Sequence, residues 1–252
     1  MLLATMLAVS AVQGSWRLVW RDEFDRTGRP DPLKWTYEKG FVRNNEAQFY
    51  TDDRRENARI ENGRLLIEAR KDNFGGHPVS SASLTTQGLA SWTYGRIEVR
   101  AKIPTGKGTW PAIWMLGDNI SKVGWPKCGE LDILENVGYD PDKAVFTVHS
   151  AKKNGTDHGA WGESVTSPGL SKDYHLYGIE WSKDKITWLF DGKPVHTFLK
   201  NDPHDVEWVF DKPQYLILNL AIGGAWGGQQ GIDESIYPSR FEIDYVRVYQ
   251  RG

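Results

Sequence analysis

Residues 129–136 read GELDILEN, in which aliphatic residues alone separate the carboxylates of Glu130, Asp132 and Glu135. This aliphatic spacing predicts a buried or half-buried β-strand. Successive side chains of a strand point to opposite faces, so Glu130 and Asp132 share a face and Glu135 would point away. One extra residue in a β-bulge would return Glu135 to the face of the other two, and bulges are common beside active sites. We therefore expect a bulged strand that presents three acids together.

Three neighbouring carboxylates raise one another's pKa and cost stability. A solvated acidic strand face is the simplest alternative, but aliphatic residues surround the acids and several tryptophans are close in sequence. The pattern favours glycoside hydrolysis, in which one glutamate attacks the anomeric carbon and another protonates the leaving oxygen. Asp132 would then hydrogen-bond the nucleophile. The residues alone do not decide which of Glu130 and Glu135 has which role.

Apolar and polar residues alternate along much of the remaining chain, and helical periodicity is nearly absent. Residues 96–103, for example, place apolar side chains on one face and charged ones on the other. The dipeptides Asn62-Gly63 and Asp191-Gly192 each stand between two such runs, where they are typical of tight hairpin turns. Short strands joined by turns of this kind predict an all-β fold, as a sandwich or jelly roll.

The composition narrows the range of partners. The chain has 252 residues and a net charge of −2, so there is no basic excess to hold a phosphate backbone, and we expect no nucleic-acid partner. Its single cysteine, Cys128, excludes an internal disulfide. A β-sandwich of this length is commonly one domain. We expect a monomer.

The first residues form an apolar stretch with small residues near its end. We interpret residues 1–14 as a secretory signal peptide or its remnant, and residues 15–252 as a single catalytic domain. A first buried strand is the alternative for the N-terminal segment. The stretch is too short to span a membrane, so no membrane partner is expected. A signal peptide predicts a secreted protein, either extracellular or periplasmic.

Tryptophan is unusually abundant, with 12 residues in the chain. Three of these residues cluster just upstream of the acidic run, and one lies in a glycine-rich segment. A flat apolar ring with a polar N–H suits the face of a pyranose sugar. The alternative is that some of these tryptophans pack in the hydrophobic core. The predicted sugar contacts are Trp110, Trp114, Trp125 and Trp226.

Two further polar residues are candidates for the same cleft. Asn45 would hydrogen-bond a sugar, and an ordinary turn amide is the alternative. His149 falls on a probable neighbouring strand, where it would lie near Glu135 and tune its pKa, or serve only the structure. His158 and Trp161, in a glycine-rich loop, would help to shape the cleft. No histidine and cysteine cluster has zinc spacing.

The run 129–135 resembles the signature of glycoside hydrolase family 16, in the bulged form with two residues between the aspartate and the second glutamate. Other segments resemble the family in the same order along the chain: residues 20–24, 44–51, 94–104, 108–117, 218–224 and 243–249. The likeness covers nearly all of the chain after the N-terminal segment. Within the family it is most similar to the laminarinases, which cut β-1,3-glucan.

The resemblance implies a fold, a mechanism and a set of roles. The fold is a β-jelly-roll sandwich of two antiparallel sheets, concanavalin A-like, with a concave substrate cleft. The mechanism is a retaining double displacement at internal β-1,3-glucosidic linkages of laminarin-type glucans. Glu130 would be the nucleophile, Asp132 its helper and Glu135 the general acid/base.

The resemblance also implies a structural Ca²⁺ ion on the convex side. The matching positions are Glu23, Gly63 through its carbonyl, and Asp244, and oxygen ligands suit this ion. Catalysis itself would need no cofactor. One departure from the laminarinase pattern is Ala225, which stands before Trp226 where asparagine is frequent, and it places fine specificity in doubt.

Several alternatives stay open at this point. The polymer could be mixed-linkage β-1,3-1,4-glucan, as in lichenan, or a marine galactan. The same sandwich also supports carbohydrate binding without chemistry. Two glutamates in a repelling trio favour the enzyme, because a binding module has no need of them.

Overall fold

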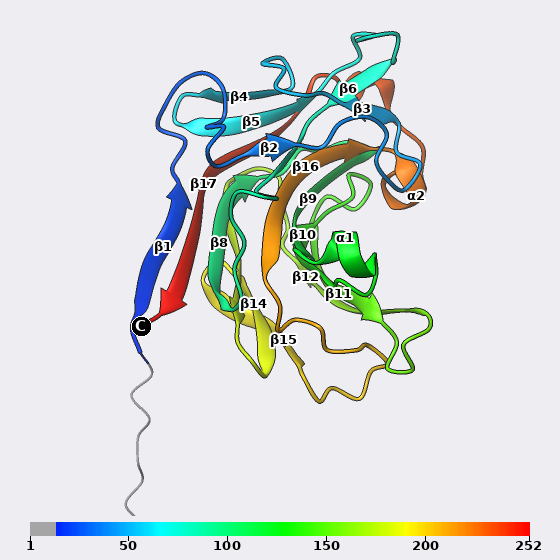
Figure 1. The fold of residues 1–252 in the computed structure, drawn as a ribbon. Helices are drawn as coiled ribbons and strands as arrows, with labels where there is room; N and C mark the ends of the chain where they lie inside the picture. Colours follow the sequence, from blue (N-terminus) through cyan, green and yellow to red (C-terminus); the bar gives the residue numbers. More distant parts are fainter. Residues whose placement is uncertain (1–13) are drawn as a thin grey trace, which may run out of the picture.

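The computed structural model describes residues 14–252 and consists of two antiparallel sheets packed face to face (Figure 1). The first sheet has eight strands in the order β15 (Lys193–Leu199), β14 (Lys185–Phe190), β13 (His175–Trp181), β8 (Gly95–Lys102), β17 (Ser239–Arg251), β5 (Arg64–Ala69) and β4 (Ala58–Glu61), with β1 (Trp16–Asp22) also paired to β17. The second sheet has seven strands in the order β12 (His158–Thr166), β11 (Lys143–Ala151), β10 (Glu130–Glu135), β9 (Thr109–Gly117), β16 (Gln214–Ile222), β7 (Ser83–Thr85) and β2 (Thr36–Tyr37).

The remaining elements are short. Strands β3 (Gln48–Tyr50) and β6 (Val79–Ser81) form a small parallel pair, and the helical turns are α1 (Ile120–Val123), α2 (Gly224–Gly227) and the 3₁₀ turn η1 (Glu234–Ile236). Within residues 14–252, no helix has the length and apolar character needed to cross a membrane. The predicted signal peptide lies outside the described residues except for Gly14.

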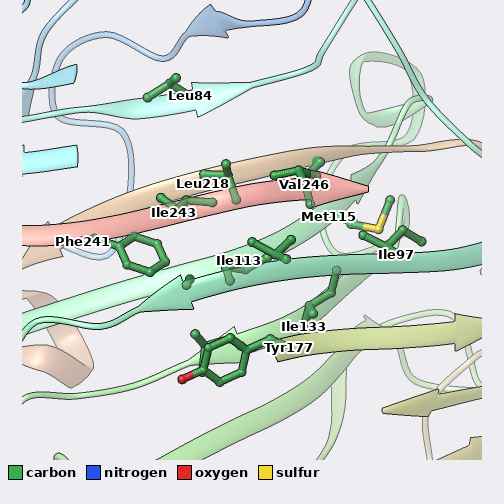
Figure 2. Close-up of a cluster of buried hydrophobic side chains, with 14 of the residues drawn as sticks. Leu84, Ile97, Ile113, Met115, Ile133, Tyr177, Leu218, Phe241, Ile243 and Val246 are labelled. Atoms are coloured by element: carbon green, nitrogen blue, oxygen red, sulfur yellow. The ribbon is translucent and has the colours of Figure 1, made fainter. Parts of the chain in front are cut away.

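The two-residue period of the strands separates the core from the outer face of the second sheet. On β9, Ile113 and Met115 point inward, and Figure 2 shows them against Ile97, Ile243 and Val246 of the first sheet. The alternate positions of β9, which include Trp114, belong to smaller clusters on the other face. Each fully buried aliphatic side chain stabilises the fold by about 1.5–3 kcal/mol.

Strand β10 carries the bulge that the sequence predicts. Its register against β9 shifts between Asp132 and Leu134, and against β11 between Asp132 and Glu135. Ile133 and Leu134 are consecutive, yet both are fully buried in the core between the sheets. Because two successive side chains point inward, the next residue, Glu135, returns to the outer face.

A core tryptophan supports this bulge from the opposite sheet. The indole N–H of Trp188, on β14, donates a hydrogen bond of 2.8 Å to the backbone carbonyl of Asp132. Trp188 is fully buried, so this bond satisfies a carbonyl that has no access to water. The core therefore holds the backbone conformation that sets the direction of the acidic side chains.

Both predicted hairpins are present. Asn62 and Gly63 have φ angles of 54° and 72° between β4 and β5, and Asp191 and Gly192 have φ angles of 49° and 74° between β14 and β15. Two consecutive positive φ angles are the requirement of a type I′ turn. The predicted all-β sandwich of two antiparallel sheets is confirmed.

Replacement of Trp188 with phenylalanine tests the support of the bulge. Trp188→Phe leaves the Asp132 carbonyl unpaired in the core, so we expect the free energy of unfolding to fall by about 1–3 kcal/mol in urea denaturation. Trp181→Phe is the matched control, because the buried Trp181 indole donates a 2.8 Å bond to the Phe210 carbonyl, away from β10. Both variants should lose stability, but only Trp188→Phe should shift the NMR signals of the His149 imidazole beside the acidic strand. Unchanged signals in that variant would contradict the proposed link.

Candidate active site

A cavity of about 780 Å³ lies on the outer face of the second sheet. Strands β9, β10, β11 and β16 contribute side chains to it, as do β12, the segment between α1 and β10, and the segments around residues 38–46 and Trp226. Glu130, Asp132 and Glu135 all line this cavity. The bulge thus brings the three acids to one site, as the sequence predicts.

His149 lies directly opposite Glu130 on the neighbouring strand β11. Its Nε2 atom is 3.3 Å from Oδ2 of Asp132 and 3.9 Å from Oε1 of Glu130. The strand register pairs Glu135 with Val145, so His149 is not its direct neighbour, but the charge of His149 still acts to lower the pKa of Glu135, as the sequence predicts. The imidazole therefore lies closest to Glu130 and Asp132.

Burial dominates the electrostatics of the three acids. Removal from water raises the pKa of Glu130 to about 7, with a further contribution from the charge of Asp132. Burial also raises the pKa of Asp132, which is only 1% exposed. Burial and the charges of the other two acids hold the pKa of Glu135 well above its ordinary value. Glu135 is therefore suited to carry a proton.

At His149 the neighbouring carboxylates together have a larger effect on the pKa than burial does. Burial by itself would lower the pKa of this imidazole, but the hydrogen bond to Asp132 and the surrounding carboxylate charges outweigh it and raise the pKa to about 9. The imidazolium therefore persists at neutral pH and offsets part of the repulsion between Glu130 and Asp132. Its contribution to stability is complete below about pH 6.5 and is lost as the pH rises through about 9.

The four predicted tryptophans all line the cavity. The indole N–H of Trp125 donates to Oε2 of Glu130 at 2.7 Å, and that of Trp110 donates to Oε1 of Glu135 at 3.0 Å. Trp226 packs edge-on against Trp110, with ring centroids 5.6 Å apart. The indole N–H of Trp114 instead donates a hydrogen bond to the side chain of Asn219 on β16. Contact between these rings and a sugar stays a prediction.

Sequence reasoning missed a polar group beside Trp114. The guanidinium of Arg43 lies 4.7 Å from the ring centre of Trp114 and forms an ion pair with Glu38. The indole N–H of Trp114 donates to Oδ1 of Asn219 at 2.7 Å, and Nδ2 of Asn219 donates to the hydroxyl of Tyr50 at 3.0 Å. One face of Trp114 is therefore occupied by a cation.

The segment of residues 44–50 contributes other side chains than the predicted one. Asn44 and Glu46 line the cavity, whereas Asn45 is exposed and is not among the lining residues. Nε2 of Gln48 donates to Glu46 at 2.7 Å and so holds its carboxylate. Asn44 and Asn45 both have positive φ angles and precede β3, so no strand alternation distinguishes them in the sequence.

His158 and Trp161, which were expected in a loop, both lie on strand β12, and only one of them reaches the cavity. His158 lines the cavity, and its Nε2 atom is 2.8 Å from Nδ1 of His149. Trp161 does not line it, because its ring packs against Trp188 and Phe198 at the edge of the core. The expected cleft role of Trp161 was wrong.

The predicted calcium residues have other partners in the structure. Both carboxylate oxygens of Glu23 accept bonds from Arg247, at 2.9 and 2.8 Å, and Oδ2 of Asp244 accepts a 2.7 Å bond from Arg100. Gly63 lies in the hairpin turn between β4 and β5. Side chains neutralised by arginine do not fit a cation site as they are placed. The calcium ion stays a prediction.

One acidic and histidine group among the described residues could hold a metal ion. It consists of Glu130, Asp132 and His149, whose nearest nitrogen and oxygen atoms all lie within 4.8 Å of one another. These side chains belong to the acidic site itself. No metal is needed for hydrolysis by two carboxyl groups.

The raised pKa of His149 predicts a stability difference that depends on pH. His149→Gln removes the imidazolium, so we expect the free energy of unfolding to fall by about 2 kcal/mol at pH 6 and by much less at pH 10, where the native imidazole is already neutral. Urea denaturation at the two pH values measures this difference. His204→Gln, at an exposed His–Asp pair, is the control and should change stability little at either pH. Equal losses for His149→Gln at both pH values would contradict the assigned charge.

Comparisons with known proteins agree with this geometry. The sequence model of glycosyl hydrolases family 16 matches residues 45–247. A β-glucanase of Rhodothermus marinus is 47% identical over 247 residues, which cover 93% of this chain and 85% of that protein. The X-ray structure of the laminarinase from Rhodothermus marinus has a TM-score of 0.88 and 45% identity, and covers 95% of this chain and 99% of that one.

A third relative has been crystallised with a sugar. SCLam, a non-specific endo-β-1,3(4)-glucanase, was co-crystallised as a variant with 1,3-β-D-cellotriosyl-glucose, and its structure has a TM-score of 0.86 and 44% identity over 96% of this chain and 97% of that one. The family model spans the acidic strand, and the three relatives cover 93–96% of this chain. The chain described here belongs to glycoside hydrolase family 16.

Proposed function

We propose that this protein is a retaining endo-β-glucanase that hydrolyses internal β-1,3-glucosidic linkages of laminarin-type glucans. The observation that carries the proposal is the bulge in β10, which places Glu130 and Glu135 in one cavity with Asp132 between them. Two glutamates that converge on one face are the requirement of the double displacement. Mixed-linkage β-1,3-1,4-glucan is a secondary substrate in this proposal.

The surroundings of the two glutamates support distinct roles. Glu130 accepts a bond from Trp125 and lies near the imidazolium of His149, and both favour its ionised form. Glu135 lies against Val145 on the side where Glu130 has His149, and its pKa is held well above the ordinary value by burial. We therefore assign Glu130 as the nucleophile and Glu135 as the general acid/base.

The reaction follows from these assignments. The Glu130 carboxylate attacks the anomeric carbon while Glu135 donates its proton to the leaving oxygen, which breaks the glycosidic bond and leaves a glycosyl ester on Glu130. Glu135, now ionised, takes a proton from water as the water attacks the same carbon. Two inversions return the original configuration. Asp132 pairs with His149, and the imidazolium favours the ionised form of Glu130 against burial and the charge of Asp132, which both raise the pKa of this nucleophile.

The names of the relatives support the substrate class. A laminarinase and a β-glucanase match most of the chain, and SCLam acts on both β-1,3 and β-1,4 linkages according to its description. The aromatic rings around the cavity suit the apolar faces of glucose units. The N-terminal apolar segment and a polymeric substrate support action outside the cytoplasm, so we propose that the protein is secreted.

Substitution of the two glutamates separates their roles. Glu130→Gln should abolish hydrolysis of every substrate, because the nucleophile loses its charge. Glu135→Gln should lose activity on laminarin but keep activity on an aryl β-glucoside with a good leaving group, which needs little protonation.

Azide should rescue Glu130→Ala and give a glycosyl azide of inverted configuration, detected by NMR. Rescue patterns exchanged between the two positions would reverse the assignment.

A polysaccharide panel tests the substrate. Laminarin, barley β-glucan, agarose and carrageenan are compared in one reducing-sugar assay with product separation. We expect laminarin to be cleaved fastest and to give a ladder of short oligosaccharides early, because an endo-acting enzyme cuts in mid-chain. Glucose released alone would refute the endo mode, and faster cleavage of agarose or carrageenan would refute the substrate. Binding of laminarin without hydrolysis would leave only a carbohydrate-binding domain.

A further inference from the structure

Each of the two glutamates has its own tryptophan donor. The indole nitrogen of Trp110 lies 3.0 Å from Oε1 of Glu135, and that of Trp125 lies 2.7 Å from Oε2 of Glu130. The two rings come from different elements, β9 and the segment between α1 and β10. Sugar stacking alone does not require either N–H to face a carboxyl group.

The Trp110 ring is held firmly in its place. It is 9% exposed, and Trp226 packs edge-on against it. Helical turn α2 closes on the same ring, since a Cβ atom at Gly227 would lie 2.9 Å from Cβ of Trp110 and one at Gly224 would lie 3.4 Å from its Cζ3. The absence of side chains at these two glycines lets the turn pack directly on the indole. The donor is therefore fixed before any substrate binds.

An indole N–H can only donate a hydrogen bond. The Glu135 oxygen that faces it, Oε1, must accept that bond and therefore does not carry a proton directed at the ring. In a protonated carboxyl group the carbonyl oxygen is the better acceptor, so the bond from Trp110 favours Oε1 as the carbonyl oxygen and Oε2 as the protonated one. Glu135 lines the cavity, so a fixed proton on Oε2 is available for a leaving oxygen bound there.

We propose that Trp110 and Trp125 are positioning residues with separate tasks: Trp110 holds the acid proton of Glu135 on Oε2, and Trp125 holds the Glu130 carboxylate as the nucleophile. The inference rests on the proposed function and adds one residue whose effect depends on the leaving group, Trp110, and one whose effect does not, Trp125. A charge-assisted bond from Trp125 to Glu130 is needed for attack on any substrate. The bond from Trp110 matters only where the leaving oxygen requires a proton.

Removal of each N–H with retention of an aromatic ring tests this division. The variants are Trp110→Phe and, as the matched comparison, Trp125→Phe. The values of kcat/KM are measured on laminarin and on a 2,4-dinitrophenyl β-glycoside of laminaribiose, because kcat/KM reports the first chemical step. Trp110→Phe should lose about tenfold to a hundredfold on laminarin and less than about threefold on the activated glycoside. Trp125→Phe should lose similar factors on both substrates.

A second replacement guards against a packing effect. Phenylalanine is smaller than tryptophan, so benzothienylalanine is also introduced at Trp110 by genetic-code expansion, because it keeps the bicyclic shape and replaces the N–H with sulfur. It should reproduce the substrate-dependent loss with an unchanged melting temperature and KM. Restored activity on laminarin in this variant would show that ring shape was the requirement and would overturn the inference.

Other outcomes are equally decisive. An equal loss on both substrates for Trp110→Phe would mean that the ring serves the site only structurally, and no loss on laminarin would mean that the N–H is dispensable. Failure of the proposed function is distinct, because the unaltered enzyme would then hydrolyse neither substrate. An active unaltered enzyme with losses independent of the leaving group rejects the inference alone.

Discussion

The inward packing of two consecutive aliphatic residues, Ile133 and Leu134, is the constraint on which the site depends. A regular strand would bury one of them and expose the other, at a cost of about 1.5–3 kcal/mol for the exposed side chain. Both side chains instead pack in the core, and the resulting bulge turns Glu135 toward the cavity. The bond from Trp188 to the Asp132 carbonyl supports the same conformation from the opposite sheet. Core packing thus sets the direction of the carboxyl groups.

This arrangement has an electrostatic cost that the site itself offsets. Three acids on one buried face repel one another, and burial raises the pKa of each. A single imidazolium, His149, lies opposite the first of them and is held in its charged form by Asp132. The compensation is uneven, because the register places His149 at one end of the strand. That inequality favours the ionised form at Glu130 more than at Glu135.

The aromatic residues of the cleft have more than one task. Trp110 and Trp125 direct their N–H groups at carboxyl oxygens, and Trp114 donates to Asn219 beneath the cation of Arg43. A tryptophan offers a large apolar ring and one donor, so it can face a sugar and fix a catalytic side chain at once. The cleft accounts for only part of the tryptophan abundance, because Trp35, Trp92, Trp181 and Trp188 are buried in the core between the sheets.

The sequence by itself determined the sandwich, the two hairpins and the bulged acidic strand. These features depend on local rules: alternation of apolar residues, Asn-Gly and Asp-Gly at positive φ angles, and two aliphatic residues between Asp132 and Glu135. Only the tertiary structure decided which residues face one another across strands. The register of β11 placed His149 opposite Glu130 and Val145 opposite Glu135, and Trp161 packs at the edge of the core. Arg43 and Asn219 reach the cavity from segments far apart in the chain, because strand pairing is a long-range choice that no local pattern encodes.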